Sequence, residues 1–217
     1  MDQSLSLADI RKNYSLKELT ENSVLPDPVR QFESWLNEAL QSNLDEPTAM
    51  VLSTATPNGK PSARVVLLKG IENGNLIFFT NYNSRKGQEL ANNPQAAITF
   101  FWPGLERQVR LEGIMGKLPE AASDAYFHSR PKGSQLGAWA SPQSQSVASR
   151  EVLQEAEHRY AKEFFGLEDI PRPAHWGGFQ FSPEYLEFWQ GRPNRLHDRI
   201  VYEKQAENNW QIKRLAP

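Results

Sequence analysis

The first apolar pattern along the chain has the period of an α-helix. Asp27 is a suitable N-cap residue, and Pro28 suits the first turn of a helix. The polar residues 1–26 before them are expected to form a mobile arm. Six apolar positions then recur every three or four residues and predict one amphipathic helix that ends near residue 43: Val29, Phe32, Trp35, Leu36, Ala39 and Leu40.

The pattern changes near Thr48 to short runs of β-branched and aromatic residues, which are typical of strands. The runs cover residues 49–55, 63–70, 76–81, 96–102 and 107–118. The dipeptides Asn58-Gly59 and Asn73-Gly74 favour hairpin turns, and a short helix over 84–93, closed by Pro94, interrupts the series. Five strands in about 70 residues without long helices between them predict an antiparallel meander and a β-barrel rather than a doubly wound sheet.

The second half of the chain adds helices first and strands afterwards. Pro119 opens a helical stretch to about His128, and a second helix marked by Leu153 and Phe164 stops at Gly166. Strands are then expected over 175–182, 184–191, 195–203 and 209–215, where they complete the same barrel. The predicted fold class is mainly β with flanking helices (α+β), in a single domain over residues 27–217.

Composition narrows the classes of function. The chain of 217 residues has a formal net charge of -2, so no basic field favours nucleic acid or an anionic membrane as a partner. It contains no cysteine, so redox chemistry would require a bound cofactor. No apolar stretch reaches the roughly 20 residues of a membrane span, and the first residues lack a signal-peptide core. We therefore expect a cytoplasmic protein. We also expect no metal site, because no set of histidines and carboxylates has the spacing of metal ligands.

Two cations at the start of the short helix break a rule of helix electrostatics. Ser84 is a good N-cap, yet Arg85 and Lys86 follow it where the helix dipole is already positive. A bound phosphate would accept the free N–H groups and pair with both cations. Alternatively, both side chains extend into solvent, and this segment alone does not decide between the two interpretations.

The strand at 64–69 carries a cation at each end. A period of two places Arg64 and Lys69 on opposite faces of the strand. Because a charge on a core-facing position is costly unless it is paired, at least one of them is expected to reach a ligand or a carboxylate. For Lys69 we favour a phosphate contact over a Schiff base, which nothing nearby in the sequence supports.

A second group of donors follows in residues 126–134. Tyr126 and Arg130 are i,i+4 neighbours on one helix face, Pro131 ends the helix, and Ser134 can fold back as a hydroxyl donor. Three donors that converge in this way suit a second phosphate. His128 has no partner in the sequence and is expected to be a structural or surface residue.

The densest set of charged and aromatic residues lies further toward the C-terminus. If residues 195–200 are extended, Arg195, His197 and Arg199 share one face of a strand, which is too polar for a core face. Trp189 adds an aromatic wall, and a cationic cleft with such a wall suits a planar anionic ligand. The alternative is a solvated strand edge.

These segments together resemble the pyridoxine (pyridoxamine) 5'-phosphate oxidase family over residues 11–217. The motifs that carry the resemblance are RVVLLK (64–69), FFTNYNSRKG (78–87), RQVRLEG (107–113), YFHSRPKGSQLGAWAS (126–141), WGGF (176–179), EFWQG (187–191), RLHDR (195–199) and RLAP (214–217). The resemblance implies an FMN-binding split β-barrel and a homodimer with FMN at the subunit interface. It also implies oxidation of pyridoxine 5'-phosphate or pyridoxamine 5'-phosphate to pyridoxal 5'-phosphate, with O2 reduced to H2O2.

The resemblance further implies which residues form the site. Arg195 and His197 would be catalytic, orienting the substrate and stabilising charge during hydride transfer from its C4' carbon to N5 of FMN. The FMN site would comprise Arg64, Val65, Val66, Leu67, Leu68, Lys69, Phe79, Thr80, Arg85, Lys86, Gln108, Gln143, Ser144, Trp189 and Arg199, some of them from the second subunit. The substrate site would comprise Arg11, Tyr14, Lys69, Tyr126, Arg130, Ser134, Arg195 and His197, with residues 11–14 in the arm that closes over the substrate.

Two features depart from the family pattern. A register shift in the segment 143–146 would move the FMN contact from Gln143 and Ser144 to Gln145 and Ser146. Phe79 stands where some members have tyrosine, which removes a hydroxyl group but leaves backbone contacts available.

Two other functions are compatible with the same fold, because a fold does not determine a function. One is a flavin reductase that uses a nicotinamide donor, and the other is a non-catalytic carrier of FMN or pyridoxal phosphate. The group formed by Tyr126, Arg130 and Ser134 favours the oxidase over the reductase, because a phosphate monoester needs such a group and a nicotinamide donor does not.

Overall fold

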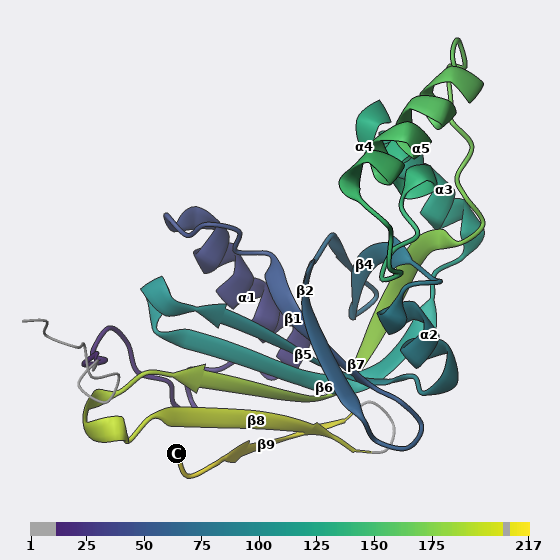
Figure 1. Cartoon of the computed structure of the whole chain (residues 1–217). Coiled ribbons are helices and arrows are strands. Elements are labelled where there is room, and N and C mark those ends of the chain that lie inside the picture. Colours follow the sequence, from purple (N-terminus) through teal and green to yellow (C-terminus); the bar gives the residue numbers. More distant parts are fainter. Residues whose placement is uncertain (1–11, 206–208) are drawn as a thin grey trace, which may run out of the picture. The chain divides into compact units, whose positions relative to one another are not determined.

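The computed structural model describes residues 12–205 and 209–217 (Figure 1). By its internal contacts the chain divides into two compact units. The terminal unit contains the described residues of 1–48, 99–111 and 184–217, and the central unit contains residues 49–98 and 112–183. The expectation of a single domain over 27–217 stays a prediction.

Within the described residues, nine strands form one sheet. Its order is β2-β1-β5-β6-β7-β4-β3, and β8 pairs with β7 and with β9. The bounds are β1 (Ala49–Ala55), β2 (Pro61–Leu67), β3 (Gly70–Glu72), β4 (Asn75–Asn81), β5 (Gln95–Trp102), β6 (Arg107–Lys117), β7 (Trp176–Gln190), β8 (Asp198–Lys204) and β9 (Trp210–Arg214). The strands expected over 49–55, 76–81, 96–102, 107–118 and 209–215 are confirmed, whereas the run over 63–70 ends at Leu67 in β2, and β3 was not expected as a separate strand. The prediction that the late strands join the early ones is also confirmed, because β7 lies between β6 and β4.

The predicted meander is wrong in its strand order. β2 and β3 follow each other in the chain but stand at opposite ends of the order, because β4 pairs with residues 176–181 of β7 rather than with β5. The two strands expected over 175–182 and 184–191 are one continuous strand, β7, despite Pro183. At that point Gly113 of β6 allows close backbone approach, since a Cβ there would lie 2.1 Å from the carbonyl oxygen of Ser182.

The central unit is built from hairpins and four helices. Asn73 and Gly74 have φ of 50° and 80°, and Gly59 has φ of 81°, so the predicted hairpin turns are confirmed. The helices are α2 (Arg85–Asn92), α3 (Glu120–Ser129), α4 (Lys132–Ala140) and α5 (Arg150–Glu163), of which α4 was not expected as a separate helix. Helices α3, α4 and α5 lie beside one another (Figure 1), around a cluster that includes Phe127 and Trp176.

The terminal unit packs α1 (Pro28–Gln41) against aromatic side chains. Asp27 caps the helix by accepting the N–H groups of the next two non-proline residues, at 2.8 and 3.1 Å, as predicted. Phe32 lies 5.0 Å from Phe100 and Trp35 lies 5.2 Å from Phe188, measured between ring centroids. Burial of each such side chain stabilises the fold by roughly 1.5–3 kcal/mol, so the amphipathic face of α1 holds this unit together.

Candidate active site

The predicted anion site lies at the first turn of α2. Ser84 caps the helix, with its Oγ accepting the N–H of Gly87 at 3.3 Å. Only glycine fits at position 87, because a Cβ there would lie 2.1 Å from the carbonyl oxygen of Tyr82. The two cations after Ser84 differ in exposure: the Arg85 side chain is 55% exposed, whereas Lys86 is 8% exposed.

Lys86 is a buried cation among neutral groups. Its Nζ donates to Gln143 Oε1 at 2.9 Å, Thr80 Oγ1 at 3.1 Å and Ser84 Oγ at 3.3 Å. Burial, together with the positive charge of Arg64, lowers the pKa of Lys86 to about 8. An ammonium group in this environment favours the approach of an anion.

Glu89 organises the other two cations. Its carboxylate accepts hydrogen bonds from Thr54 Oγ1 and Ser62 Oγ, both at 2.5 Å, and from Arg85 Nε at 2.9 Å, with Arg64 Nη2 at 3.5 Å. Burial raises the pKa of Glu89, but these hydrogen bonds outweigh burial and lower it to about 2. The expected carboxylate partner of Arg64 is therefore Glu89, which the sequence reasoning missed although its i,i+4 spacing from Arg85 was a usable signal.

Three parallel aromatic rings form a wall in the central unit. The ring centroid of Tyr126 lies 3.7 Å from that of Phe79 and 6.3 Å from that of Trp176, and the planes are within 11° of parallel. Phe79 comes from β4, Tyr126 from α3 and Trp176 from the start of β7. Burial raises the pKa of Tyr126, and the nearby charge of Arg130 opposes that effect.

The guanidinium of Arg130 lies against this aromatic wall. It caps the C-terminal end of α3 before Pro131, and its guanidinium carbon lies 4.5 Å from the ring centroid of Trp176. Its Nη1 is buried and has no hydrogen-bond partner among the described residues. Because an unpaired buried donor is costly, this geometry fits an anion that would accept the N–H.

Two other predicted substrate residues lie at the surface. Ser134 stands in the first turn of α4, where its N–H donates to the carbonyl oxygen of Pro131 at 2.8 Å. Lys69 follows β2, is exposed, and donates its N–H to the carbonyl oxygen of Ile77 at 2.8 Å. The structure thus brings Tyr126 and Arg130 together and leaves Ser134 and Lys69 open to solvent.

The terminal unit contains an aromatic and cationic cleft of about 660 Å³. His197 lies 4.6 Å from Trp189 and 5.6 Å from Tyr14, measured between ring centroids. Burial and the charge of Arg195 lower the pKa of His197, which favours its neutral form. Its Nδ1 accepts the N–H of Arg192 at 3.0 Å, which leaves the ring proton on Nε2. The cleft is lined by Lys12, Asn13, Tyr14, Trp189, Arg192, Asn194, Arg195 and His197.

The expectation of one extended face over residues 195–200 is wrong. Asn194 and Arg195 adopt left-handed conformations with φ of 57° and 62°, in a 3-10 turn at Pro193–Arg195, and β8 begins only at Asp198. Proline and asparagine favour this turn over a strand. Arg199 instead pairs with Glu187, with Nε to Oε1 at 2.8 Å and Nη2 to Oε2 at 3.0 Å.

The remaining predicted residues lie as follows. Arg11 is outside the described residues. Gln108 is half-buried on β6, and Ser144 is exposed with φ of 71°. Residues 64–67 belong to β2, in which Val65 is 64% exposed, while Leu68 is buried just after it.

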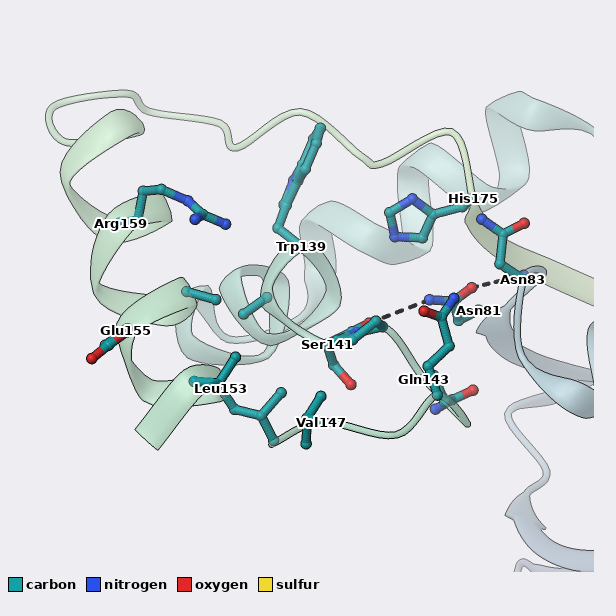
Figure 2. A pocket seen from close by; sticks show the side chains of 15 residues that line it. Asn81, Asn83, Trp139, Ser141, Gln143, Val147, Leu153, Glu155, Arg159 and His175 are labelled. Carbon is teal, nitrogen blue, oxygen red and sulfur yellow. Dashed lines mark hydrogen bonds between the residues drawn. The ribbon is translucent and has the colours of Figure 1, made fainter. Parts of the chain in front are cut away.

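A second cavity, of about 440 Å³, adjoins the loop that carries Gln143 (Figure 2). Asn81 donates from Nδ2 to the carbonyl oxygen of Ser141 at 3.5 Å across its edge. Gln143 and Gln145 both line the cavity, but the hydrogen bond from Lys86 is made to Gln143. The assignment of Gln143 rather than Gln145 to the FMN contact stays a prediction, which this hydrogen bond supports.

In the part of the chain that the structure describes, no group of three or more histidine, aspartate or glutamate residues is placed to hold a metal ion. None of the helices described there is long and apolar enough to cross a membrane.

Two protein families match this sequence. Residues 36–160 match the family described as "Pyridoxamine 5'-phosphate oxidase", and residues 176–217 match the "Pyridoxine 5'-phosphate oxidase C-terminal dimerisation region". The chain belongs to the pyridoxine/pyridoxamine 5'-phosphate oxidase family. This confirms the resemblance drawn from the motifs, and the family is FMN-dependent.

Individual relatives support the same conclusion. The chain is 56% identical over 211 residues to the pyridoxine/pyridoxamine 5'-phosphate oxidase of Cupriavidus metallidurans, covering 97% of this chain and 99% of that protein. It is 54% identical to the protein of that name from Gloeothece citriformis over the full length of both chains.

Two solved structures confirm the predicted split-barrel fold class. PhzG from Burkholderia lata, solved with tetrahydrophenazine-1-carboxylic acid, is similar with a TM-score of 0.86 and 29% identity, covering 94% of this chain and all of that one. A pyridoxamine 5'-phosphate oxidase-related, FMN binding protein from Nostoc punctiforme has a TM-score of 0.70 at 18% identity, covering 88% of this chain and 98% of the other, and shows the fold alone.

Proposed function

We propose that this protein is an FMN-dependent oxidase that converts pyridoxine 5'-phosphate or pyridoxamine 5'-phosphate to pyridoxal 5'-phosphate, with O2 reduced to H2O2, in vitamin B6 salvage. The observation that carries the proposal is the buried Nη1 of Arg130, which no described residue hydrogen-bonds, beside an aromatic wall. A substrate that combines an aromatic ring with a phosphate monoester meets both features. Curated relatives of this name at more than half sequence identity support the same substrate class.

The residues of the central unit fit the phosphate of FMN. Lys86 is buried, and its hydrogen-bond partners among residues 12–205 and 209–217 are the neutral groups of Thr80, Ser84 and Gln143. Arg64 and the first N–H groups of α2 add positive potential at the same helix terminus. We infer that Lys86, Arg64 and Arg85 hold this phosphate, while the Glu89 carboxylate positions Arg64 and Arg85.

FMN, held by Lys86 and the residues around it, would supply the redox chemistry of the proposed reaction, a two-electron transfer from the substrate to O2. Arg130 binds the substrate phosphate, and Tyr126 contributes its ring to the adjoining wall. Arg195 and His197, whose Nδ1 accepts the N–H of Arg192 and whose Nε2 can therefore carry the ring proton, are the groups we assign to orienting the pyridine ring and donating to it. The amine substrate gives an imine, which water hydrolyses to the aldehyde and ammonia.

We also propose that the protein is a cytoplasmic homodimer with FMN at the subunit interface. The match of residues 176–217 to a family dimerisation region supports the dimer.

Anaerobic mixing with pyridoxine 5'-phosphate tests the proposed function. The oxidase should bleach its flavin absorbance with this substrate and should reduce oxygen to H2O2 when air is admitted. Pyridoxine without the phosphate is the matched control and should react far more weakly at equal concentration, because it leaves Arg130 unpaired. Bleaching by a nicotinamide donor alone would identify a flavin reductase, and no bleaching by either compound would identify a carrier.

A further inference from the structure

Glu106 is a buried carboxylate that the proposed chemistry does not use. Its residue is 4% exposed, and it stands at the end of a 3-10 turn (Pro103–Leu105) that leads into β6. Its backbone is left-handed, with φ of 56° and ψ of 39°. Glycine adopts this conformation freely and other residues rarely do, so a glutamate here indicates a task for its side chain.

The side chain holds the N-terminal arm. Oε2 of Glu106 accepts the N–H groups of Ser15 at 2.8 Å and Leu16 at 3.0 Å, and Oε1 lies 3.9 Å from Lys12 Nζ. Its carbonyl oxygen accepts the N–H of Gly191 at 2.8 Å. One residue therefore ties the arm at residues 15–16 to the end of β7.

Tyr14 lies between these two attachments. Its ring packs on Gly191, where a Cβ would come within 2.7 Å of Tyr14 Cγ. The ring makes edge contacts with Trp189 and with His197, each at 5.6 Å between centroids. Tyr14 thus forms one wall of the cleft that contains His197 and Arg195, and its place depends on where residues 15 and 16 are held.

Other anchors of the arm lie on both sides of Tyr14. Before it, Lys12 Nζ donates to the carbonyl oxygen of Pro103 at 3.1 Å. Leu19 donates its N–H to Asp198 Oδ2 at 3.1 Å, and Lys17 pairs with Glu38 in an exposed ion pair. The contacts of Lys12, Lys17 and Leu19 lie two to five residues from Tyr14, whereas Ser15 and Leu16 follow it directly. The carboxylate of Glu106 is the acceptor adjacent to it.

We propose that Glu106 is a positioning residue. By holding residues 15 and 16 it keeps Tyr14 against the cleft that contains His197 and Arg195, and so determines how tightly the substrate ring is enclosed. The proposal rests on the proposed function for the identity of that ring. It concerns a substrate-binding conformation of the arm, which can be measured without turnover.

Limited proteolysis measures the attachment directly. The FMN-loaded protein without substrate is treated with trypsin, and cleavage after Lys12 and Lys17 is followed by mass spectrometry. Glu106→Gly removes the carboxylate at a backbone conformation that suits glycine, and it should accelerate this cleavage roughly 10-fold, the lower end of what charge-assisted hydrogen bonds provide. Glu106→Gln keeps an acceptor oxygen and should restore most of the protection. An unchanged rate in Glu106→Gly would overturn the proposal.

Glu18→Gln is the matched control. Glu18 is another carboxylate of the arm, it is 67% exposed in its side chain, and it pairs with Arg192 at the surface. Since exposed ion pairs contribute little, this variant should cleave within about twofold of the wild-type rate. A Glu18→Gln rate as high as that of Glu106→Gly would show that any loss of charge loosens the arm, and would overturn the specific role of Glu106.

Steady-state kinetics then test whether Glu106 acts through Tyr14. Glu106→Gly should raise KM for pyridoxine 5'-phosphate roughly 10-fold with FMN affinity unchanged, and this effect should disappear in a Tyr14→Ala background. Gly191→Ala, which displaces the Tyr14 ring directly, should raise KM in the same way. A rise in KM from Glu106→Gly that persists in the Tyr14→Ala background would show that Glu106 does not act through Tyr14. A Gly191→Ala variant with wild-type KM would likewise overturn the action of Glu106 through Tyr14. If no variant or wild type oxidises the substrate, the proposed function fails, while the proteolysis result still decides the attachment.

Discussion

Replacing Lys86 with methionine should weaken FMN binding and abolish its dependence on pH near 8. Lys86 is 8% exposed and, in the described part of the chain, donates to neutral oxygens alone, so the folded protein carries the cost of its desolvation before the cofactor binds. A phosphate that accepts from this ammonium recovers that cost. Loss of a charge-assisted hydrogen bond of about 1.5–3 kcal/mol corresponds to a roughly 10- to 100-fold rise in Kd for FMN.

The pH dependence follows from the lowered pKa. Burial and the positive charge of Arg64 together bring the pKa of Lys86 to about 8 in the protein without FMN. The group is therefore charged below pH 8 and neutral above it, whereas the phosphate has its second pKa near 6 and keeps its charge. From pH 7.5 to pH 9 the charged fraction of Lys86 falls about eightfold, so the Kd of the wild type for FMN should rise by about that factor.

Fluorescence titration of the FMN-free protein at several pH values measures both effects. Riboflavin, which lacks the phosphate, should show neither the Lys86→Met loss nor the rise in Kd between pH 7.5 and pH 9. Lys60→Met, an exposed lysine in the turn between β1 and β2, is the matched control and should bind FMN as the wild type does. A Lys86→Met protein with unchanged FMN affinity, or one that keeps the full pH dependence, would refute the assignment of this lysine to the phosphate.

Three further outcomes are expected. Arg130→Met should raise KM for pyridoxine 5'-phosphate roughly 10- to 100-fold with a smaller change in kcat, because the phosphate it binds does not react; steady-state kinetics with an unaltered KM would contradict this. Arg195→Leu should slow flavin reduction in anaerobic stopped-flow experiments at saturating substrate with FMN still bound, and His197→Asn should do so more mildly; an unchanged reduction rate in Arg195→Leu would leave it a binding residue only. Sedimentation at micromolar concentration should show a homodimer, and an active, FMN-loaded monomer would disprove the dimer.

Local sequence chemistry predicted the local structure well. Asp27 and Ser84 cap the helices that their positions indicated, and Asn73-Gly74 forms the expected turn with both residues at positive φ. In each case the determining interactions lie within a few residues, so the sequence contains the information in readable form. The short helix that places Lys86 is therefore predictable from its own residues and their immediate neighbours.

The parts that were missed depend on contacts distant in the chain. Glu89 accepts from Thr54 and Ser62, and Glu187 holds Arg199 across two strands, and no spacing rule links these positions. The pairing of β4 with β7 joins residues about 100 apart in the same way. Nearer the cleft, alternation of polar and apolar residues suggested a strand over 195–200, but the turn preference of the preceding proline and asparagine prevailed.

The turn at Pro193–Arg195 has a consequence for the entropy of binding. Proline fixes one backbone dihedral, and Asn194 and Arg195 are held in left-handed conformations that few unfolded chains populate. The backbone that carries Arg195 is therefore ordered when the protein folds rather than when a ligand arrives. A ligand that enters the cleft loses less affinity to the ordering of its receptor, and preorganisation of this kind leaves more of the contact energy for recognition.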